Sequence, residues 1–187
     1  WKSPPGGGSY GDTGTRIQAI DTEKVGERMK ETVGFVGLGD MGEGMARNVL
    51  KIAHRLVVYD LRQEPVNRMV ACGATAAKDI GDIASRSQWI VLVLPDADVV
   101  RSVVLGDGGL LEQLADGHIL VDCGTTHPVA TREIWSEVQK KGAHLIDAPV
   151  SGMKARAEDG SLTIMAGGVM RKRSGPCPLF SRRWRVT

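Results

Sequence analysis

The sequence predicts one α/β domain built on a mostly parallel, doubly wound β-sheet. Three observations lead to this prediction: short apolar runs alternate with segments of helical periodicity, several of the runs are rich in Val and Ile, and a glycine-rich turn joins the first run to the first helix. Continuous apolar strands are typical of sheets covered by helices on both faces. Strands and helices in alternation favour right-handed crossovers, and such sheets bind ligands at the carboxyl ends of their strands, where the winding reverses.

Seven apolar segments are predicted as strands. They are residues 33–37, 56–60, 74–76, 89–94, 118–122, 144–147 and 162–166. The segments between them carry apolar residues at helical spacing. The predicted helices are residues 41–49, 66–71, 98–104 and 129–140.

The length of 187 residues suits one domain with tails and is short for a two-domain enzyme. Residues 1–30 begin with a Pro- and Gly-rich stretch and remain polar, so we expect a disordered N-terminal extension. The first methionine, Met29, stands four residues before the first apolar run. This position raises the hypothesis that residues 1–28 are an upstream reading and not native protein.

We expect the α/β domain to cover residues 31–168 and a basic tail to follow over residues 169–187. The tail lacks acidic residues and shows neither helical nor strand periodicity. A frame change or truncation near Val169 would produce such a segment. An arm that binds nucleic acid is the alternative, because basic tails bind without a fold behind them.

The charge balance points to no polyanionic partner. The chain has 24 Lys and Arg against 22 Asp and Glu, so neither nucleic acid nor an anionic membrane is expected to bind it. The three cysteines are odd in number and far apart, which predicts neither a disulfide framework nor a metal site. No apolar run approaches the ~20 residues that span a bilayer. We therefore expect a cytoplasmic protein with a small-molecule ligand.

The most specific motif is the turn Gly37-Leu38-Gly39-Asp40-Met41-Gly42 after the first strand. In such a turn Gly37 permits a tight bend, Gly39 lets the backbone approach a pyrophosphate, and Gly42 lets the helix pack closely on the strand. The N-terminus of the helix then holds the phosphates through its N–H groups and its partial positive charge. The motif indicates dinucleotide binding by all six residues; a structural turn that binds nothing is the alternative.

Asp60 supports the same interpretation and bears on the choice of cofactor. It ends the second predicted strand, 18 residues after Gly42, where a carboxylate can accept hydrogen bonds from both ribose hydroxyls. A carboxylate would also repel the 2′-phosphate of NADP, so NAD is favoured. Arg62 stands close enough in sequence to soften this rule, so NADP stays possible. The alternative for Asp60 is a solvated turn residue.

Together these residues resemble a known family. Residues 37–48 are similar to the signature GLGxMGxxMAxN of the 3-hydroxyisobutyrate dehydrogenases, or β-hydroxyacid dehydrogenases, which are related to 6-phosphogluconate dehydrogenase. Three more blocks follow in the family's order: Leu94-Pro95, residues 122–128 (DCGTTHP, similar to DxSTxxP) and residues 147–152 (DAPVSG, similar to DAPVSGG). The resemblance covers about residues 32–168 and implies a Rossmann-type NAD(P)-binding domain.

The later blocks fall where a doubly wound sheet places its ligand. Leu94 and Pro95 follow a strand next to the first one and can form a wall beside the nicotinamide. Thr125 could bond the nicotinamide or the substrate; a simple turn hydroxyl is the alternative. Ser151 and Gly152 could hold a substrate carboxylate, as the resemblance implies. Without the resemblance they would be an ordinary loop.

The chain departs from the family pattern at three positions. Gly124 replaces a Ser, Met153 replaces the third residue of SGG, and Arg156 stands where another Gly is usual. These changes leave the substrate open. Cys123 and His127 have no visible catalytic partner, so we expect core or turn roles for them, and Lys154 is expected at a charged rim.

The resemblance implies a dehydrogenase that moves a hydride between a nicotinamide and a small 3-hydroxy acid or its semialdehyde. In the family a lysine on a later helix exchanges the proton, and that helix leads to an all-helical domain through which we expect homo-oligomers to form. Nothing after Gly168 matches that helix, so no catalytic residue is named, and we expect a truncated form that retains cofactor binding. A non-catalytic dinucleotide-binding or interaction module is the alternative. An FAD-binding domain would leave the three later blocks unexplained.

Overall fold

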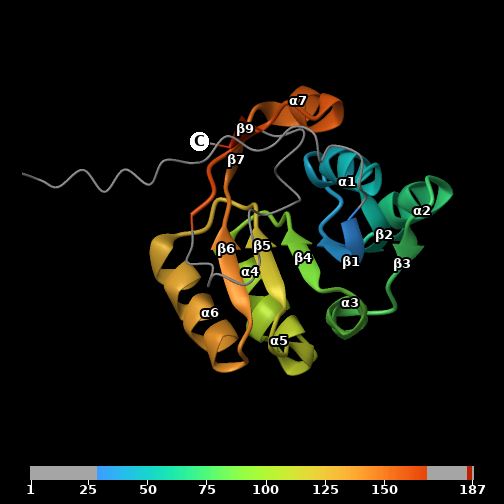
Figure 1. Cartoon of the computed structure of the whole chain (residues 1–187). Coiled ribbons are helices and arrows are strands. Elements are labelled where there is room, and N and C mark those ends of the chain that lie inside the picture. The colour runs from blue at the N-terminus through green and yellow to red at the C-terminus, as the bar shows by residue number, and fades with distance from the viewer. Residues whose placement is uncertain (1–28, 168–184, 187) are drawn as a thin grey trace, which may run out of the picture.

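The computed structural model describes residues 29–167 and 185–186 of the chain (Figure 1). Most of the predicted N-terminal extension and of the basic tail lies outside these residues. The described part forms a sheet with helices on both of its faces. None of the helices in residues 29–167 is long and apolar enough to cross a membrane.

The main sheet has six strands, and every neighbouring pair is parallel. Its strands are β1 (Met29–Val36), β2 (Ala53–Tyr59), β3 (Thr75–Ala76), β4 (Trp89–Leu92), β5 (Ile119–Asp122) and β6 (His144–Asp147). They are arranged in the order β3-β2-β1-β4-β5-β6. The chain therefore winds outward from β1 in one direction and from β4 in the other, which confirms the doubly wound fold.

Seven helices accompany the strands in the described part of the chain. They are α1 (Gly42–Leu50), α2 (Gln63–Ala71), α3 (Ile80–Arg86), α4 (Ala97–Leu105), α5 (Leu110–Gln113), α6 (Pro128–Lys140) and α7 (Met153–Asp159). Figure 1 shows α1, α2 and α7 on one side of the sheet and α3 to α6 on the other. This arrangement places the reversal of winding between β1 and β4.

Two apolar clusters, one on each face, hold the layers together. On β1, Phe35 belongs to the cluster under α1, α2 and α7, whereas Val36 belongs to the cluster under α3 to α6. Successive side chains of a strand point to opposite faces, so a strand covered on both sides must be apolar throughout. This requirement explains why continuous Val- and Ile-rich runs, and not alternating ones, marked the strands in the sequence.

Some boundaries and elements differ from those predicted. Strand β1 begins at Met29, so Met29 and Lys30, which we assigned to the extension, belong to the sheet. Residues 162–166 supply only the short strand β8 (Thr163–Ile164), which pairs with β7 (Val150–Ser151) and β9 (Arg185–Val186) in a separate small sheet. Helices α3, α5 and α7 were not predicted, because each has at most seven residues and so carries little periodic signal.

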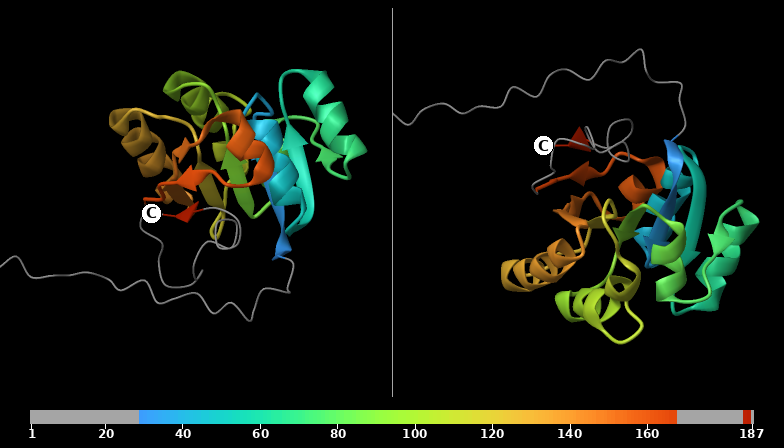
Figure 2. Two further views of the ribbon diagram at one scale, coloured as in Figure 1. Left: turned by 90° about the horizontal axis from the view of Figure 1, so that it is seen from above. Right: turned by 60° about the horizontal axis from the view of Figure 1, so that its bottom comes forward.

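Helix α7 packs directly on α1, although the two are far apart in sequence (Figure 2). The buried Asn48 of α1 donates from Nδ2 to the carbonyls of Ala157 (2.8 Å) and Glu158 (3.1 Å). A Cβ at Gly44 would lie 3.0 Å from the carbonyl carbon of Ala157, so only a small residue permits this approach. Gly44, at a variable position of the signature, and Asn48, at its last fixed position, therefore hold α7 on α1, close to the turn that follows β1.

Candidate functional site

The turn between β1 and α1 is shaped by two glycines that the fold requires. Gly37 has a φ of +95°, and a Cβ there would collide with the carbonyl oxygen of Val93. A Cβ at Gly42 would collide with the carbonyl oxygen of Gly37. Both neighbours are backbone atoms, which cannot rotate away. The bend and the close helix–strand packing expected at these positions are therefore present.

Gly39 differs from both, because it faces open space. The nearest atom within 4 Å of a Cβ built on Gly39 is Nη2 of Arg62, at 4.0 Å. No side chain caps α1 at its N-cap residue, Met41, and the N–H of Glu43 in the first turn donates to the carbonyl of Gly39 (3.1 Å). The side chain of Leu38 is buried in the core and that of Asp40 is exposed, so Leu38 offers this space its backbone alone.

Asp60 follows β2 and is bonded to this turn. Its Oδ2 accepts from the backbone N–H of Leu38 (2.7 Å), and its Oδ1 accepts from the backbone N–H (2.8 Å) and Nε (3.2 Å) of Arg62. Burial alone would raise the pKa of Asp60, but the backbone N–H groups of Arg62 and Leu38 outweigh it and hold the pKa below its usual value. The side chain is only 10% exposed, so Asp60 is not the solvated turn residue of the alternative interpretation.

The loops after β4 and β5 meet at Gly124. A Cβ at Gly124 would lie 3.1 Å from both the carbonyl oxygen of Leu94 and Oδ1 of Asp122. The buried Asp122 shapes the β5 loop, because it accepts from the Gly124 N–H (2.9 Å) and the Thr126 hydroxyl (2.7 Å). Thr125, between these two contacts, is exposed. A side chain at Gly124 would therefore require these neighbours to shift by a few tenths of an ångström.

The segment after β6 returns to the same edge of the sheet. The N–H of Ala148 donates to the carbonyl of Asp122 (2.7 Å), which holds this segment beside the end of β5. Ser151 is exposed at the end of β7, and Gly152 precedes α7 with a φ of +140°. The space beside the Gly152 Cα is filled by Arg156, whose Cδ would lie 2.7 Å from a Cβ. Gly152 is therefore required by the start of α7 itself.

The structure thus brings the predicted site residues to one edge of the sheet. Gly37 to Gly42 follow β1, Asp60 follows β2, Leu94 and Pro95 follow β4, and Thr125 follows β5, so these residues all lie at the carboxyl ends of parallel strands. Ser151 and Gly152 are connected to this edge through α7, which packs on α1.

Three residues that we assigned structural or rim roles lie as expected. Cys123 is buried in the core, and the Nδ1 of His127 accepts from the N–H of Val129 (3.3 Å) at the start of α6. Lys154 is exposed on α7. These positions agree with a core role, a turn role and a charged rim.

One pair of carboxyl groups was not singled out from the sequence. Asp122 and Asp147 are register partners at the ends of β5 and β6. Burial raises the pKa of Asp147, and the negative charge of Asp122 raises it further. The available signal was that both residues end a buried apolar strand.

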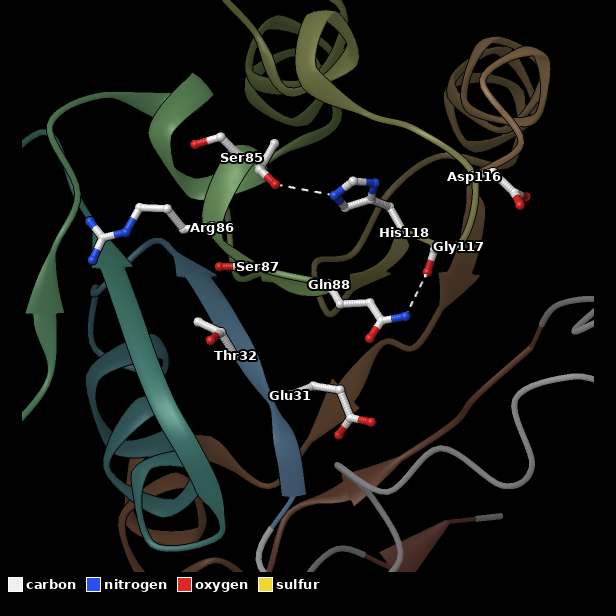
Figure 3. A pocket seen from close by; sticks show the side chains of 10 residues that line it. Glu31, Thr32, Ser85, Arg86, Ser87, Gln88, Asp116, Gly117 and His118 are labelled. Atoms are coloured by element: carbon white, nitrogen blue, oxygen red, sulfur yellow. Dashed lines mark hydrogen bonds between the residues drawn. The ribbon is translucent and has the colours of Figure 1, made fainter.

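A cavity lies at the opposite, amino end of the strands (Figure 3). It has a volume of about 340 Å³ and is lined by none of the predicted site residues. Some of its polar groups are bonded within the fold, whereas the buried Oγ of Ser87 has no hydrogen-bond partner among the described residues. The ring of His118 accepts at Nδ1 from the Ala115 N–H (3.0 Å) and reaches the Ala84 carbonyl with Nε2 (3.1 Å), and Gln88 donates to Gly117 (3.4 Å).

Comparison with known families agrees with the glycine turn. A profile of the family described as the NAD-binding domain of 6-phosphogluconate dehydrogenase matches residues 32–182, which is more than half of the chain. The chain belongs to this family. This membership confirms the resemblance seen in residues 37–48. The match of this NAD-binding domain extends beyond Gly168, so it includes part of the segment that we predicted as a tail outside the family.

Individual relatives are similar over most of this chain and about half of their own length. The NAD-dependent L-serine dehydrogenase of Pseudomonas aeruginosa is 38% identical over 148 residues, which cover 79% of this chain and 50% of that protein. The mitochondrial 3-hydroxyisobutyrate dehydrogenase of Rattus norvegicus is 37% identical over 140 residues, which cover 75% of this chain and 42% of that protein. A solved structure of Psf3 in complex with NADP+ and 2-OPP is 26% identical with a TM-score of 0.74, covering 83% of this chain and 56% of that one.

Proposed function

We propose that this chain binds NAD, and NADP less tightly, at the turn between β1 and α1. The observation that carries the proposal is the difference among the three glycines: Gly37 and Gly42 are closed in by backbone, whereas Gly39 faces open space. A pyrophosphate fits beside a residue without a side chain, and the N-terminus of the following helix favours an anion there. The turn from Gly37 to Gly42, with Leu38, Asp40 and Met41 between the glycines, holds the phosphates, and Asp60 holds the ribose.

The other predicted residues would serve the reacting end of the cofactor. When bound, NAD supplies the hydride acceptor for oxidation of a carbon that bears a hydroxyl group. Leu94 and Pro95 form one wall beside the nicotinamide, and the exposed Thr125 offers a hydroxyl next to it. Ser151, with the backbone of Gly152, offers donors for the carboxylate of a small 3-hydroxy acid. The named activities of the relatives, on L-serine and 3-hydroxyisobutyrate, support this class of substrate.

A second function is dinucleotide binding without turnover. It is favoured because none of the residues that we place at the site is a Lys or a His. General acid/base help contributes ~10² to 10⁴ in rate, so a site without such a group should bind the cofactor far better than it oxidises a substrate.

Calorimetric titration of the full chain with NAD and with NADP tests cofactor binding and choice. We expect NAD to bind more tightly, because the Asp60 carboxylate repels the 2′-phosphate. Asp60→Ala should narrow the difference between the two affinities, whereas the matched variant Asp116→Ala, at the amino end of the strands, should leave it unchanged. A tighter affinity for NADP in the unmodified chain would overturn the proposed preference.

Absorbance at the wavelength of the reduced nicotinamide separates the two functions. The full chain is incubated with NAD and with 3-hydroxyisobutyrate, L-serine or glycerate. Binding with negligible reduction is the result we expect and supports the second function. Steady turnover would support the dehydrogenase and would direct the search for a proton-exchanging group to Lys154 and His127.

A further inference from the structure

Arg156 lies against the glycine that we place at the substrate carboxylate. A Cβ built on Gly152 would lie 2.7 Å from Cδ and 3.0 Å from Cβ of Arg156, so the aliphatic part of this side chain covers one side of the Gly152 Cα. Side chains of a helix lean toward its N-terminus, which brings Arg156 of α7 back over Gly152. The guanidinium begins at the next atom, Nε, so its donors are held at the start of α7.

The guanidinium of Arg156 is exposed and has no close partner. It forms no hydrogen bond or ion pair with any residue that the structure describes. The pKa of Asp159 is lowered mainly by hydrogen bonds from Ser161 and, as the smallest contribution, by the charge of Arg156. The five N–H donors of the guanidinium are therefore available to a ligand.

Most other arginines whose side chains the structure describes are paired with a carboxylate. Those in ion pairs are Arg47, Arg62, Arg68, Arg86 and Arg101. Within the described residues, Arg55 and Arg132 are outside any ion pair, as Arg156 is. Arg55 lies on β2 and Arg132 on α6, whereas Arg156 packs on a residue of the proposed site. Its position therefore links an uncompensated charge to substrate binding.

A single carboxylate can be bound at this site without Arg156. The hydroxyl of Ser151 and the backbone of Gly152 are the donors that we assign to it. Arg156 adds a planar fork of N–H groups, which matches the two oxygens of a carboxylate. When Ser151 and Gly152 hold one carboxylate, the guanidinium beside them remains free to bind a second acid group.

We propose that the substrate of this chain carries a second acid group, which Arg156 binds; this inference rests on the proposed substrate site at Ser151 and Gly152. The substrate class is a small 3-hydroxy acid with two carboxylates. One carboxylate is held by Ser151 and Gly152, and the other pairs with the Arg156 guanidinium through two parallel hydrogen bonds. The resembled family usually has Gly at this position, so the preference is a property of this chain.

The test is calorimetric titration of the full chain, saturated with NADH, with 3-hydroxybutyrate and with 3-hydroxyglutarate. The two acids differ by one carboxylate on the terminal carbon. Neither can transfer a hydride to the cofactor, because acid and cofactor are both in the reduced form. We expect 3-hydroxyglutarate to bind about tenfold more tightly, since a charge-assisted bidentate pair is added.

Arg156→Met keeps an aliphatic stem beside Gly152 and removes the charge. It should bind 3-hydroxyglutarate about tenfold more weakly than the unmodified chain does, and 3-hydroxybutyrate within about twofold of it. Arg156→Lys should restore part of the loss, because an ammonium keeps the charge but lacks the planar fork. Arg55→Met is the matched control: it removes an exposed arginine on β2 and should change neither affinity.

The outcomes separate the inference from the function on which it rests. A loss confined to 3-hydroxyglutarate in Arg156→Met, with none in Arg55→Met, supports it. Equal losses for both acids, or a preference for 3-hydroxyglutarate that persists in the folded Arg156→Met variant, overturn it. An unmodified chain that binds 3-hydroxybutyrate at least as tightly also overturns it, and the proposed carboxylate site then stands. A chain that binds NADH but neither acid overturns the inference and the proposed substrate site together, and leaves the cofactor site standing.

Discussion

The turn after β1 and the loops after β5 and β6 lie at the same edge of the sheet, but they are fixed to different degrees. In the first region Gly37 and Gly42 are enclosed by backbone atoms and Asp60 is bonded to Leu38. In the second region the hydroxyls of Thr125 and Ser151 are exposed and make no hydrogen bond with any residue that the structure describes. The first region is thus determined by the fold, and its roles can be tested through stability. The roles of these two hydroxyls in the second region can be tested only by adding a ligand.

The largest expected effect comes from adding a side chain at the enclosed Gly42 of the first region. Gly42→Ala should lower the free energy of unfolding by about 3 kcal/mol, because the added Cβ collides with the Gly37 carbonyl and neither backbone can yield cheaply. Chemical denaturation at neutral pH measures it. Gly39→Ala is the matched control: its Cβ enters open space, so the change should stay within about 0.5 kcal/mol. Equal losses in both variants would break the distinction between the two glycines.

The second effect should appear in binding and not in stability. Gly39→Val should weaken NAD binding by about 100-fold or more, because its branches fill the space beside the turn and keep the pyrophosphate from backbone N–H groups. Circular dichroism should show a folded protein, and calorimetry measures the affinity. Unchanged NAD affinity in the folded variant would refute the assignment of the turn as the phosphate site.

The difference between the regions also explains what the sequence could predict. Gly37 and Gly42 were identifiable because the backbone conformation or close approach at each of them allows no other residue. Strands were identifiable because burial on both faces demands unbroken apolar runs. The side chain of Arg62 over Gly39 depends on a rotamer, which no local pattern encodes. Helix α7 buries only Ala157, so its own sequence gives no amphipathic signal. Its position depends instead on Gly44 and Asn48 in a distant helix.

The start of α3 and the substitution at Met153 were both visible in the sequence. Asp79 precedes α3 and accepts from the N–H of Asp82 (2.7 Å), which is a helix-capping pattern visible in the sequence. Met153, where the family has Gly, has a φ of +61°, a conformation that favours glycine. The sequence showed this substitution but not the backbone angle at Met153.

The pH dependence of stability tests the ion pairs of Glu43, which follows the glycine turn of the first region. The Arg68 guanidinium, together with that of Arg47, lowers the pKa of Glu43 from 4.5 to about 2. The ionised carboxylate is therefore favoured in the folded state, and its stabilisation is complete above pH 4.5 and is lost as the pH falls toward 2. Glu43→Gln should cost about 1 kcal/mol at pH 7, the scale of partly exposed ion pairs. Thermal unfolding from pH 7 to pH 2.5 should show the stability difference between the unmodified chain and Glu43→Gln becoming smaller. A difference that does not depend on pH would contradict the ionic role of Glu43.

The smallest effect is expected in the second region, with the opposite sign. Burial and the charge of Asp122 raise the pKa of Asp147 above its usual 3.8, so the folded state disfavours the ionised form. Stability contributed by the protonated group is present below pH 3.8 and is lost as the pH rises through the folded pKa. Asp147→Asn keeps the shape without the charge and should raise the melting temperature at pH 7. The gain should be below about 1 kcal/mol, because solvent still screens the half-buried carboxyl.

The gain in Asp147→Asn should vanish below pH 3.8, where the native residue is neutral in both states, and the exposed control Asp116→Asn should show no comparable change. Arg132 lines a cavity of about 200 Å³ with Asp147, yet no ion pair joins them within the residues that the structure describes. A loss of stability at pH 7 would therefore mean that Asp147 gains a cationic partner in solution, and the second region would then be fixed by charge as firmly as the first is by backbone.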